Sequence, residues 1–480
     1  MRKLLIPALL LLALTLPNCG SSSSGVKTSG IPYRAFVSNS VSGSTAAGVY
    51  IVNAETDVHP IGLAPIGAGT TPGMMVVTPN RSQTLVFSPG ANPQFPENLL
   101  TIIRNSSESS VGHVSLLEPT ESIIVSPDSS TAYVAIPLRQ VIGQQQSQGA
   151  IELYALSGSN PGASAGEIDI PSVQYLSIDN EGDRILGFSP NGTNPNQIAV
   201  VTPANLGTNN PVVTYVGGFD YPVQAFFSSD DTTAYVVNCG PECGGNQASI
   251  QTLDMTTNPP TPGPPPPVTC ISGARCLGTL PLPAGSVALV NSTTMYVAGT
   301  PYATNGQPSQ PCTGQTTAAQ TCGLLSVVDL PTLTQTGSAV ITDGYHNRIA
   351  LGANGQLFVG AQTCTEIIPP ISPPAGAEVR GCLSIYNTLN AAVGTVPAFG
   401  VVIPPANGNV TGLQPISTRD VVYVVQGYPV PGGSLHIYCA IADADIDCPT
   451  ADALQTAPVN QPSYAPLMVG SFYDVKTVDF

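Results

Sequence analysis

Charged residues are scarce in this chain of 480 residues, and tryptophan is absent. Asp, Glu, Lys and Arg make up 9% of the sequence, whereas ordinary soluble domains contain about 25%. Only 13 lysines and arginines oppose 29 aspartates and glutamates, giving a net charge of −16. Because nucleic acid binding needs clustered cations, this balance excludes nucleic acid as a partner. The acidity is spread along the chain, and we interpret it as a contribution to solubility.

Uninterrupted helix-forming stretches are also missing, because 48 glycines and 48 prolines break up the sequence. Proline breaks helices, and glycine costs roughly 1 kcal/mol in a helix interior. Both residues suit short strands joined by turns. The hydrophobic content of 42% is too high for a disordered chain. We therefore predict an all-β protein.

The longest apolar run lies at the N-terminus, from Leu4 to Leu16, directly after Arg2 and Lys3. A basic start followed by an apolar stretch of this length predicts a secretory signal peptide rather than a membrane span. The run ends in Leu16-Pro17-Asn18-Cys19. This ending resembles a bacterial lipobox, although Asn18 stands where a small residue is usual.

The lipobox resemblance implies a signal peptide over residues 1–18 and acylation of Cys19, for example with palmitate. Residues 19–32 contain Gly20-Ser21-Ser22-Ser23-Ser24-Gly25, which is typical of a flexible tether. We expect an exported protein anchored in the cell envelope, at the outer membrane or cell surface rather than the inner membrane. The alternative is ordinary signal cleavage without a lipid.

The eleven cysteines support export. Without Cys19, ten remain, and they fall into close pairs that suit disulfides in an oxidising compartment. No pair is followed by the second Cys or His pair of a structural zinc site, so we predict neither a metal nor a cofactor. Pairing across neighbours, such as Cys243 with Cys270, stays open. The predicted disulfides are Cys239/Cys243, Cys270/Cys276, Cys312/Cys322, Cys364/Cys382 and Cys439/Cys448.

A strand-like motif recurs through the mature chain. An aromatic residue or Leu, followed by small and β-branched residues, occurs eight times at spacings of 48 to 65 residues. Each copy precedes a second strand-like run, and most follow an apolar run with a tight turn. Four strands per repeat predict the blade of a β-propeller. The copies are Ala35–Asn39, Leu85–Phe87, Ala132–Val134, Ile185–Phe188, Ala234–Asn238, Met295–Val297, Leu357–Val359 and Val422–Val425.

Tyr235-Val236-Val237-Asn238 is similar to the YVTN-type repeat of bacterial envelope β-propellers. We predict one propeller over residues 33–480, with eight blades by repeat count and seven as the alternative. The N-terminal repeat lacks an inner strand, and Val475–Asp479 resembles one. The C-terminal strand should therefore complete the N-terminal blade and leave no open sheet edge.

Long loops follow the second strands, including residues 300–321 and 363–381, whereas the turns between first and second strands are short. Variable loops on a rigid scaffold are common binding sites. We therefore predict a monomeric, non-catalytic binding scaffold that presents disulfide-shaped loops to a protein or glycan. The alternative is that these loops only tolerate insertions. The Pro-rich segment Pro259–Pro267 is interpreted as a stiff spacer, with a polyproline ligand as the alternative.

Sequence signs of catalysis are weak, and no catalytic residue is predicted. Gly162-Ala163-Ser164-Ala165-Gly166 matches the serine hydrolase string, but that string needs a strand-to-helix elbow. Asp343, His346 and Arg348 could form an acid–base group, although a surface histidine is the simpler interpretation. His59, His113 and His436 fall in different repeats without ligand spacing. Asp443, Asp445 and Asp447 alternate as in a calcium loop, but the glycine and the distal glutamate of such a loop are missing. Propellers with similar repeats resemble lactonases, which act on sugar lactones with residues around the central channel, and none of those residues can be matched in this chain. A lactonase-like hydrolase is the alternative function.

Overall fold

The computed structural model describes most of the chain after the N-terminal segment. No helix of the described residues is long and apolar enough to cross a membrane. These residues are 28–40, 46–92, 94–138, 149–202, 213–270, 275–301, 323–341, 344–352, 355–362, 382–388, 401–402, 409–416, 419, 421–426, 433–439 and 468–479.

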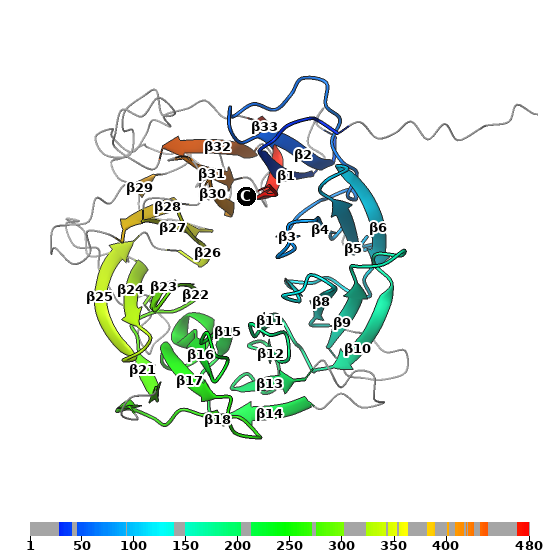
Figure 1. The fold of residues 1–480 in the computed structure, drawn as a ribbon. Helices are drawn as coiled ribbons and strands as arrows, with labels where there is room; N and C mark the ends of the chain where they lie inside the picture. Colours follow the sequence, from blue (N-terminus) through cyan, green and yellow to red (C-terminus); the bar gives the residue numbers. More distant parts are fainter. Residues whose placement is uncertain are drawn as a thin grey trace, which may run out of the picture.

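Antiparallel sheets stand side by side in a closed ring, each with one edge towards the centre (Figure 1). This arrangement is a β-propeller, as predicted. We call the strand nearest the centre the inner strand. The sheets with one inner strand each are β3 (Met75–Val77) to β6 (Ser109–Ser115) through β4 (Gln83–Ser88) and β5 (Leu99–Arg104); β7 (Ser122–Val125), β8 (Thr131–Ile136), β9 (Ala150–Ala155) and β10 (Ser164–Asp169); β11 (Tyr175–Ile178), β12 (Ile185–Phe188), β13 (Gln197–Val201) and β14 (Val213–Gly217); β15 (Pro222–Phe227), β16 (Thr233–Asn238), β17 (Ser249–Asp254), β18 (Thr261–Pro262) and β21 (Thr279–Pro281); β22 (Val287–Asn291), β23 (Thr294–Gly299), β24 (Gly323–Asp329) and β25 (Thr334–Ile341); and β26 (His346–Leu351), β27 (Gln356–Ala361), β28 (Cys382–Asn387) and β29 (Val401–Val402).

The two ends of the chain share the remaining large sheet, which we call the closing sheet. Its strand order is β2-β1-β33-β32-β31-β30. Val37 of β1 pairs with Val475 of β33, and Leu435 of β32 pairs with Met468 at the other end of β33. The strands are β1 (Arg34–Ser40), β2 (Gly48–Asn53), β30 (Val410–Ile416), β31 (Val421–Gln426), β32 (Gly433–Cys439) and β33 (Met468–Thr477).

The predicted count of eight blades was wrong. Within the described residues, seven sheets of four or more strands form the ring. Repeat counting gave the first and last repeats a blade each, but the ten-residue strand β33 pairs with both and joins them into one sheet. The expected closure is present, because β33 supplies the inner strand that the first repeat lacks. It also continues into the last repeat, which the sequence did not predict.

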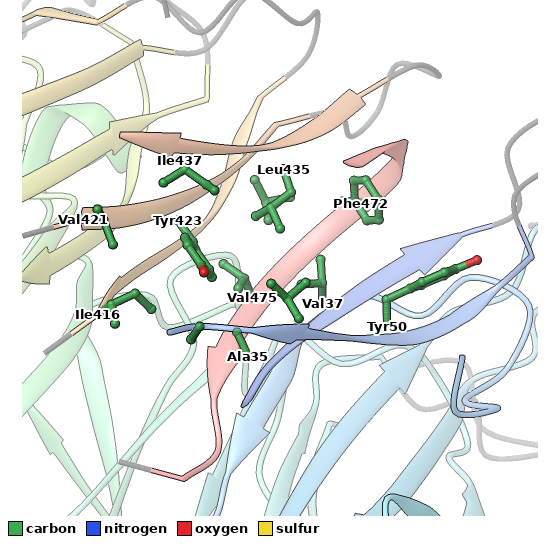
Figure 2. Close-up of a cluster of buried hydrophobic side chains, with 13 residues drawn as sticks. Ala35, Val37, Tyr50, Ile416, Val421, Tyr423, Leu435, Ile437, Phe472 and Val475 are labelled. Atoms are coloured by element: carbon green, nitrogen blue, oxygen red, sulfur yellow. The ribbon is translucent and has the colours of Figure 1, made fainter. Parts of the chain in front are cut away.

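Apolar side chains from both halves of the closing sheet meet in one buried cluster (Figure 2). Phe472 and Val475 of β33 lie between Val37 of β1 and Leu435 of β32, and Phe472, Val475, Val37 and Leu435 are all fully buried. The ion pair between Arg419 and Asp57, at 2.8 Å, adds a polar link between the last and first repeats. Closure therefore rests on core packing as well as on strand pairing.

Most of the remaining core lies between neighbouring sheets. Leu85 and Ile102 of the β3–β6 sheet share a buried cluster with Ile123 and Val134 of the β7–β10 sheet. Second strands are the most buried elements, and β16 is buried at every position. Strands with neighbours on both edges and sheets on both faces favour such continuous β-branched and aromatic runs. This packing explains the recurring Tyr-Val motif.

The inner strands all begin on the same side of the ring. Ser122 at the start of β7 pairs with Ala135 near the end of β8, and Pro222 of β15 pairs with Asn238 at the end of β16. The loops after second strands therefore open on that side, which we call the loop face. The tight turns between inner and second strands lie on the opposite side, the short-turn face.

Candidate functional site

Polar and aromatic side chains gather where the inner strands begin, at the loop-face end of the ring centre. We call Glu121, Gln174, Tyr175, Glu242 and Tyr345 the channel-mouth cluster. Glu121 directly precedes β7, Tyr175 opens β11, and Tyr345 directly precedes β26. The cluster thus draws on several sheets that are far apart in the sequence.

A pair of tyrosines connects sheets that are not neighbours. The phenol of Tyr175 lies close enough to the Tyr345 hydroxyl and to the Glu121 carboxylate for both groups to raise its pKa. The inner strands β15 and β22 lie between β11 and β26 around the ring, so the tyrosine pair reaches across the centre (Figure 1). Tyr345 keeps 37% of its surface exposed, so it faces the open mouth rather than a core.

The amide of Gln174 fixes the acidic side of this pair. Its Nε2 donates to Glu121 Oε2 at 2.5 Å, and its Oε1 accepts from Asn191 Nδ2 at 2.9 Å. Burial, together with the Tyr345 hydroxyl and the Glu121 carboxylate, raises the pKa of Tyr175. Burial also raises the pKa of Tyr345, with the Glu242 carboxylate as the next cause. Both phenols therefore stay protonated and can donate hydrogen bonds.

Glu242 belongs to a turn that is closed by a disulfide. It lies in the 3-10 helix η2 (Gly240–Cys243), and the disulfide Cys239–Cys243 brackets this turn. The backbone N–H of Thr300 donates to Glu242 Oε2 at 3.0 Å, and Ser286 lies close enough to the same carboxylate to lower its pKa. A Cβ at Gly299 would lie 2.8 Å from Glu242 Oε2, so glycine at the end of β23 gives the carboxyl its space.

Burial raises the pKa of Glu242 to about 7 despite these hydrogen bonds. Desolvation disfavours the charged carboxylate, and the Thr300 and Ser286 donors offset only part of that cost. A carboxyl with this pKa exchanges protons near neutral pH. The channel mouth therefore holds one fixed titrating group beside two fixed phenols.

Two of the five predicted disulfides lie within the described residues and are formed. Cys239 bonds to Cys243, and Cys270 bonds to Cys276. The second disulfide closes the two-stranded sheet of β19 (Thr269–Cys270) and β20 (Cys276–Leu277). The other three predicted pairs and the predicted lipid site are not fully covered by the described residues. Cys382 and Cys439 are placed only as strand residues of β28 and β32. The cysteines outside the described residues are Cys19, Cys312, Cys322, Cys364 and Cys448.

The structure shows a different role for the residues considered as an acid–base group. Asp343 lies outside the described residues, and His346 is fully buried on β26, so the expectation of a surface histidine was wrong. Arg348 Nε donates to the Thr411 carbonyl oxygen at 2.5 Å and so ties β26 to β30. These contacts are structural links between neighbouring sheets.

The other histidines do not come together. His59 Nδ1 lies 2.8 Å from the Ile51 carbonyl oxygen, and His113 Nδ1 lies 3.3 Å from Thr101 Oγ1. His436 is on β32, in another sheet. Among the described side chains, no group of three or more His, Cys, Asp or Glu is placed to hold a metal ion.

The remaining motifs have structural roles or fall outside the description. Ser164 begins the strand β10, so it is not on a strand-to-helix elbow. Pro262 pairs with Leu253 of β17 in the short strand β18, and the chain then leads to the Cys270–Cys276 disulfide. The calcium-like triplet Asp443, Asp445 and Asp447 lies outside the described residues.

Comparisons with known proteins show the fold alone. No protein-family model matches the chain, and no curated protein matches it. The dihydro-heme d1 dehydrogenase NirN is 12% identical, with a TM-score of 0.54 over 94% of this chain and 76% of that one. A eukaryotic initiation factor is 12% identical, with a TM-score of 0.50 over 93% and 98%. A candidate 6-phosphogluconolactonase from Bacteroides fragilis is 11% identical, with a TM-score of 0.46 over 80% and 96%.

Proposed function

We propose that this protein is a lipid-anchored binding module of the bacterial cell envelope, with the channel mouth on the loop face as its contact surface. The propeller serves as a non-catalytic scaffold that presents a disulfide-held turn and fixed tyrosines to a protein or glycan. The observation that carries this proposal is the Tyr175–Tyr345 pair beside the stapled Glu242.

The export part of the proposal rests on two independent features. The N-terminal pattern resembles a lipoprotein signal ending at Cys19, and the disulfides Cys239–Cys243 and Cys270–Cys276 suit an oxidising compartment. Mass spectrometry of the native protein tests it directly. We expect a diacyl or triacyl mass on a chain that starts at Cys19. An unmodified Cys19, or a mature chain with another start, would overturn the anchor.

The binding part rests on how the cluster is held. Tyrosine supplies a large contact area and a hydroxyl with few rotatable bonds, which is why it is common at binding hot spots. Here the phenols and Glu242 are already fixed by hydrogen bonds and a disulfide, so little ordering is needed on binding. Such preorganised groups on an exposed face favour recognition.

A matched pair of variants tests the contact surface. The envelope fraction is passed over immobilised protein, and bound protein and glycan are quantified for Tyr345→Ala and Tyr215→Ala. Both tyrosines are exposed, but Tyr215 lies on β14 at the outer edge of its sheet. We expect Tyr345→Ala to lose about tenfold in affinity, since hot-spot truncations cost about 2 kcal/mol, and Tyr215→Ala to bind as wild type. Equal binding by both variants would overturn the proposed surface.

A lactonase-like hydrolase is the second candidate, favoured by one observation. Glu242, with a pKa of about 7, has the protonation behaviour of a general acid–base group at neutral pH. If this candidate holds, the protein hydrolyses a sugar lactone, and Glu242→Gln loses about 100-fold in turnover. Turnover that is unchanged in Glu242→Gln, or that stays at the buffer rate, would exclude a role of this carboxyl in hydrolysis.

A further inference from the structure

Three of the few basic residues of this chain line one cavity on the short-turn face. The cavity measures about 300 Å³ and lies between the closing sheet and the β3–β6 sheet. Arg34, Arg81 and Arg104 line it, together with Asn105, Ser106 and Asp479. In a chain of net charge −16, such a concentration of guanidinium groups needs an explanation.

Arg34 is fully committed to the fold. Its Nε and Nη2 donate to the Asp479 carboxylate at 2.8 and 2.5 Å. Its Nη1 donates to Glu108 Oε1 at 3.0 Å and to the Asn105 carbonyl oxygen at 2.6 Å. Two carboxylates therefore surround this one guanidinium, and both are used by it.

Arg81 and Arg104 are not matched in this way. Arg81 Nη1 donates to the Thr477 carbonyl oxygen at 3.2 Å, and the side chain of Arg104 forms no hydrogen bond or ion pair within the described part of the chain. Both side chains are exposed. The cavity thus offers two guanidinium groups with most of their donors available.

No other described repeat has arginine at the position of Arg104, whereas Arg419 in the closing sheet occupies the same turn position as Arg81. Arg81 has a left-handed backbone (φ 57°) in the turn between inner and second strands, where the three sheets that follow along the chain carry serine, glycine and aspartate. Arg104 ends a third strand and pairs with Gln83 at the start of the second strand. The corresponding residues are Ser129, Gly182, Asp231 and Arg419 for Arg81, and Asp254 and Asp329 for Arg104.

Arg104 therefore departs from the other repeats. Arg81 differs from Arg419 in its partner, because Arg419 pairs with the Asp57 carboxylate and the Arg81 side chain donates only to the Thr477 carbonyl oxygen among the described residues. The left-handed backbone region disfavours a large side chain such as arginine. At the end of the third strand, where Arg104 lies, two other repeats carry an aspartate. The hydrogen bond from Arg81 to Thr477 links its turn to β33, whereas no side-chain hydrogen bond or ion pair among the described residues explains Arg104 by the fold.

We propose that this cavity binds a compact oxyanion, either a carboxylate or a phosphate group, between Arg81 and Arg104. The planar guanidinium fork matches the paired oxygens of both groups. Arg34 holds the cavity wall through Asp479 and Glu108, and does not itself serve as a ligand. The site lies on the face opposite the channel mouth and is independent of the function proposed there.

Titration calorimetry on the mature chain tests the proposal. The probes are inorganic phosphate and glucuronate, in low-salt buffer free of other oxyanions. We expect saturable binding of at least one probe, and the two arms decide which oxyanion source is preferred. Arg104→Gln and Arg81→Gly should each weaken it about tenfold or more, as expected for loss of a charged hydrogen-bonding partner.

Two control variants separate the anion site from folding effects. Ser292→Gly changes an exposed left-handed residue (φ 56°) in another sheet without altering charge, and Arg184→Gln removes an arginine outside the cavity. Both should bind the probes as wild type does. No saturable binding of either probe, or equal binding by wild type, Arg104→Gln and Arg81→Gly, would overturn the proposal.

Discussion

On the loop face, the starts of the inner strands carry phenols and carboxyls, which influence one another's pKa across the ring. On the short-turn face, a polar cavity is lined by arginines that belong to the first two repeats. The loop-face groups come together because the ring closes. The short-turn groups come together because adjacent turns of neighbouring sheets open on the same side.

The difference shows where a repeat protein places its chemistry. The strands repeat because they fill the same apolar space between sheets, as the fully buried β16 illustrates. The turn and strand-end positions are not constrained by that packing. Single repeats can therefore carry Arg81 or Tyr345 without loss of the shared strand packing, which we call the frame. The following variants test whether this frame and the candidate sites can be altered separately.

The largest expected effect is a difference in stability between variants of Arg34 and Arg104, which line the same cavity. Arg34→Met leaves the carboxylates of Glu108 and Asp479 without their cationic partner and should destabilise the fold by about 3–5 kcal/mol. Arg104→Gln should change stability by no more than about 0.5 kcal/mol. Urea unfolding of both variants checks this contrast. Similar losses in the two variants would contradict the assignment of Arg34 as the frame residue.

The next effect concerns pH at the channel mouth. Burial holds the pKa of Glu242 at about 7, above the 4.5 of an unfolded chain. The unfolded state then binds fewer protons between these values, so stability present below pH 4.5 is lost as pH rises through 7. The loss should be of the order of 3 kcal/mol. Urea unfolding from pH 4.5 to 8 should show this fall in wild type and a smaller fall in Glu242→Gln, whereas parallel curves would rule out the shift.

The two disulfides give a matched comparison of intermediate size. Removing either pair, as Cys239→Ala with Cys243→Ala or as Cys270→Ala with Cys276→Ala, should cost about 2 kcal/mol. Only the first pair brackets Glu242, so only its loss should alter the pH dependence. Thermal unfolding at pH 5 and 8 measures both properties. An altered pH dependence in the Cys270/Cys276 variant would argue against local control of Glu242.

The smallest effect is a test of strain. Arg81 has a φ of 57°, where glycine is favoured, so Arg81→Gly should hold stability or raise it by up to about 1 kcal/mol. Urea unfolding at low salt measures it. A loss greater than 1 kcal/mol would mean that the arginine side chain supports the fold and would weaken its assignment to an anion site.

The frame could be predicted from the sequence, because packing imposes a pattern on it. Tyr235-Val236-Val237-Asn238 forms most of β16, and Val475 pairs with β1 as expected. The blade count could not be predicted, since repeat spacing does not reveal that β33 pairs on both of its edges. Two disulfides followed from sequence proximity alone.

The candidate site was mostly missed. Tyr175 and Tyr345 meet only when sheets distant in sequence are brought around the ring, so no local pattern signals their contact. A comparison of positions would have helped, because Glu121, Tyr175 and Tyr345 each lie at the start of an inner strand. Glu242 was visible between Cys239 and Cys243, but its burial was not.

Site-specific photocrosslinking in intact cells tests the central proposal, that the channel mouth is the contact surface. A photoreactive phenylalanine analogue replaces Tyr345 in one strain and Tyr215 in another, since both residues are exposed but lie on different parts of the propeller. We predict a discrete crosslinked partner from position 345 and none from position 215. Crosslinks from 215 alone, or from neither position, would contradict the account.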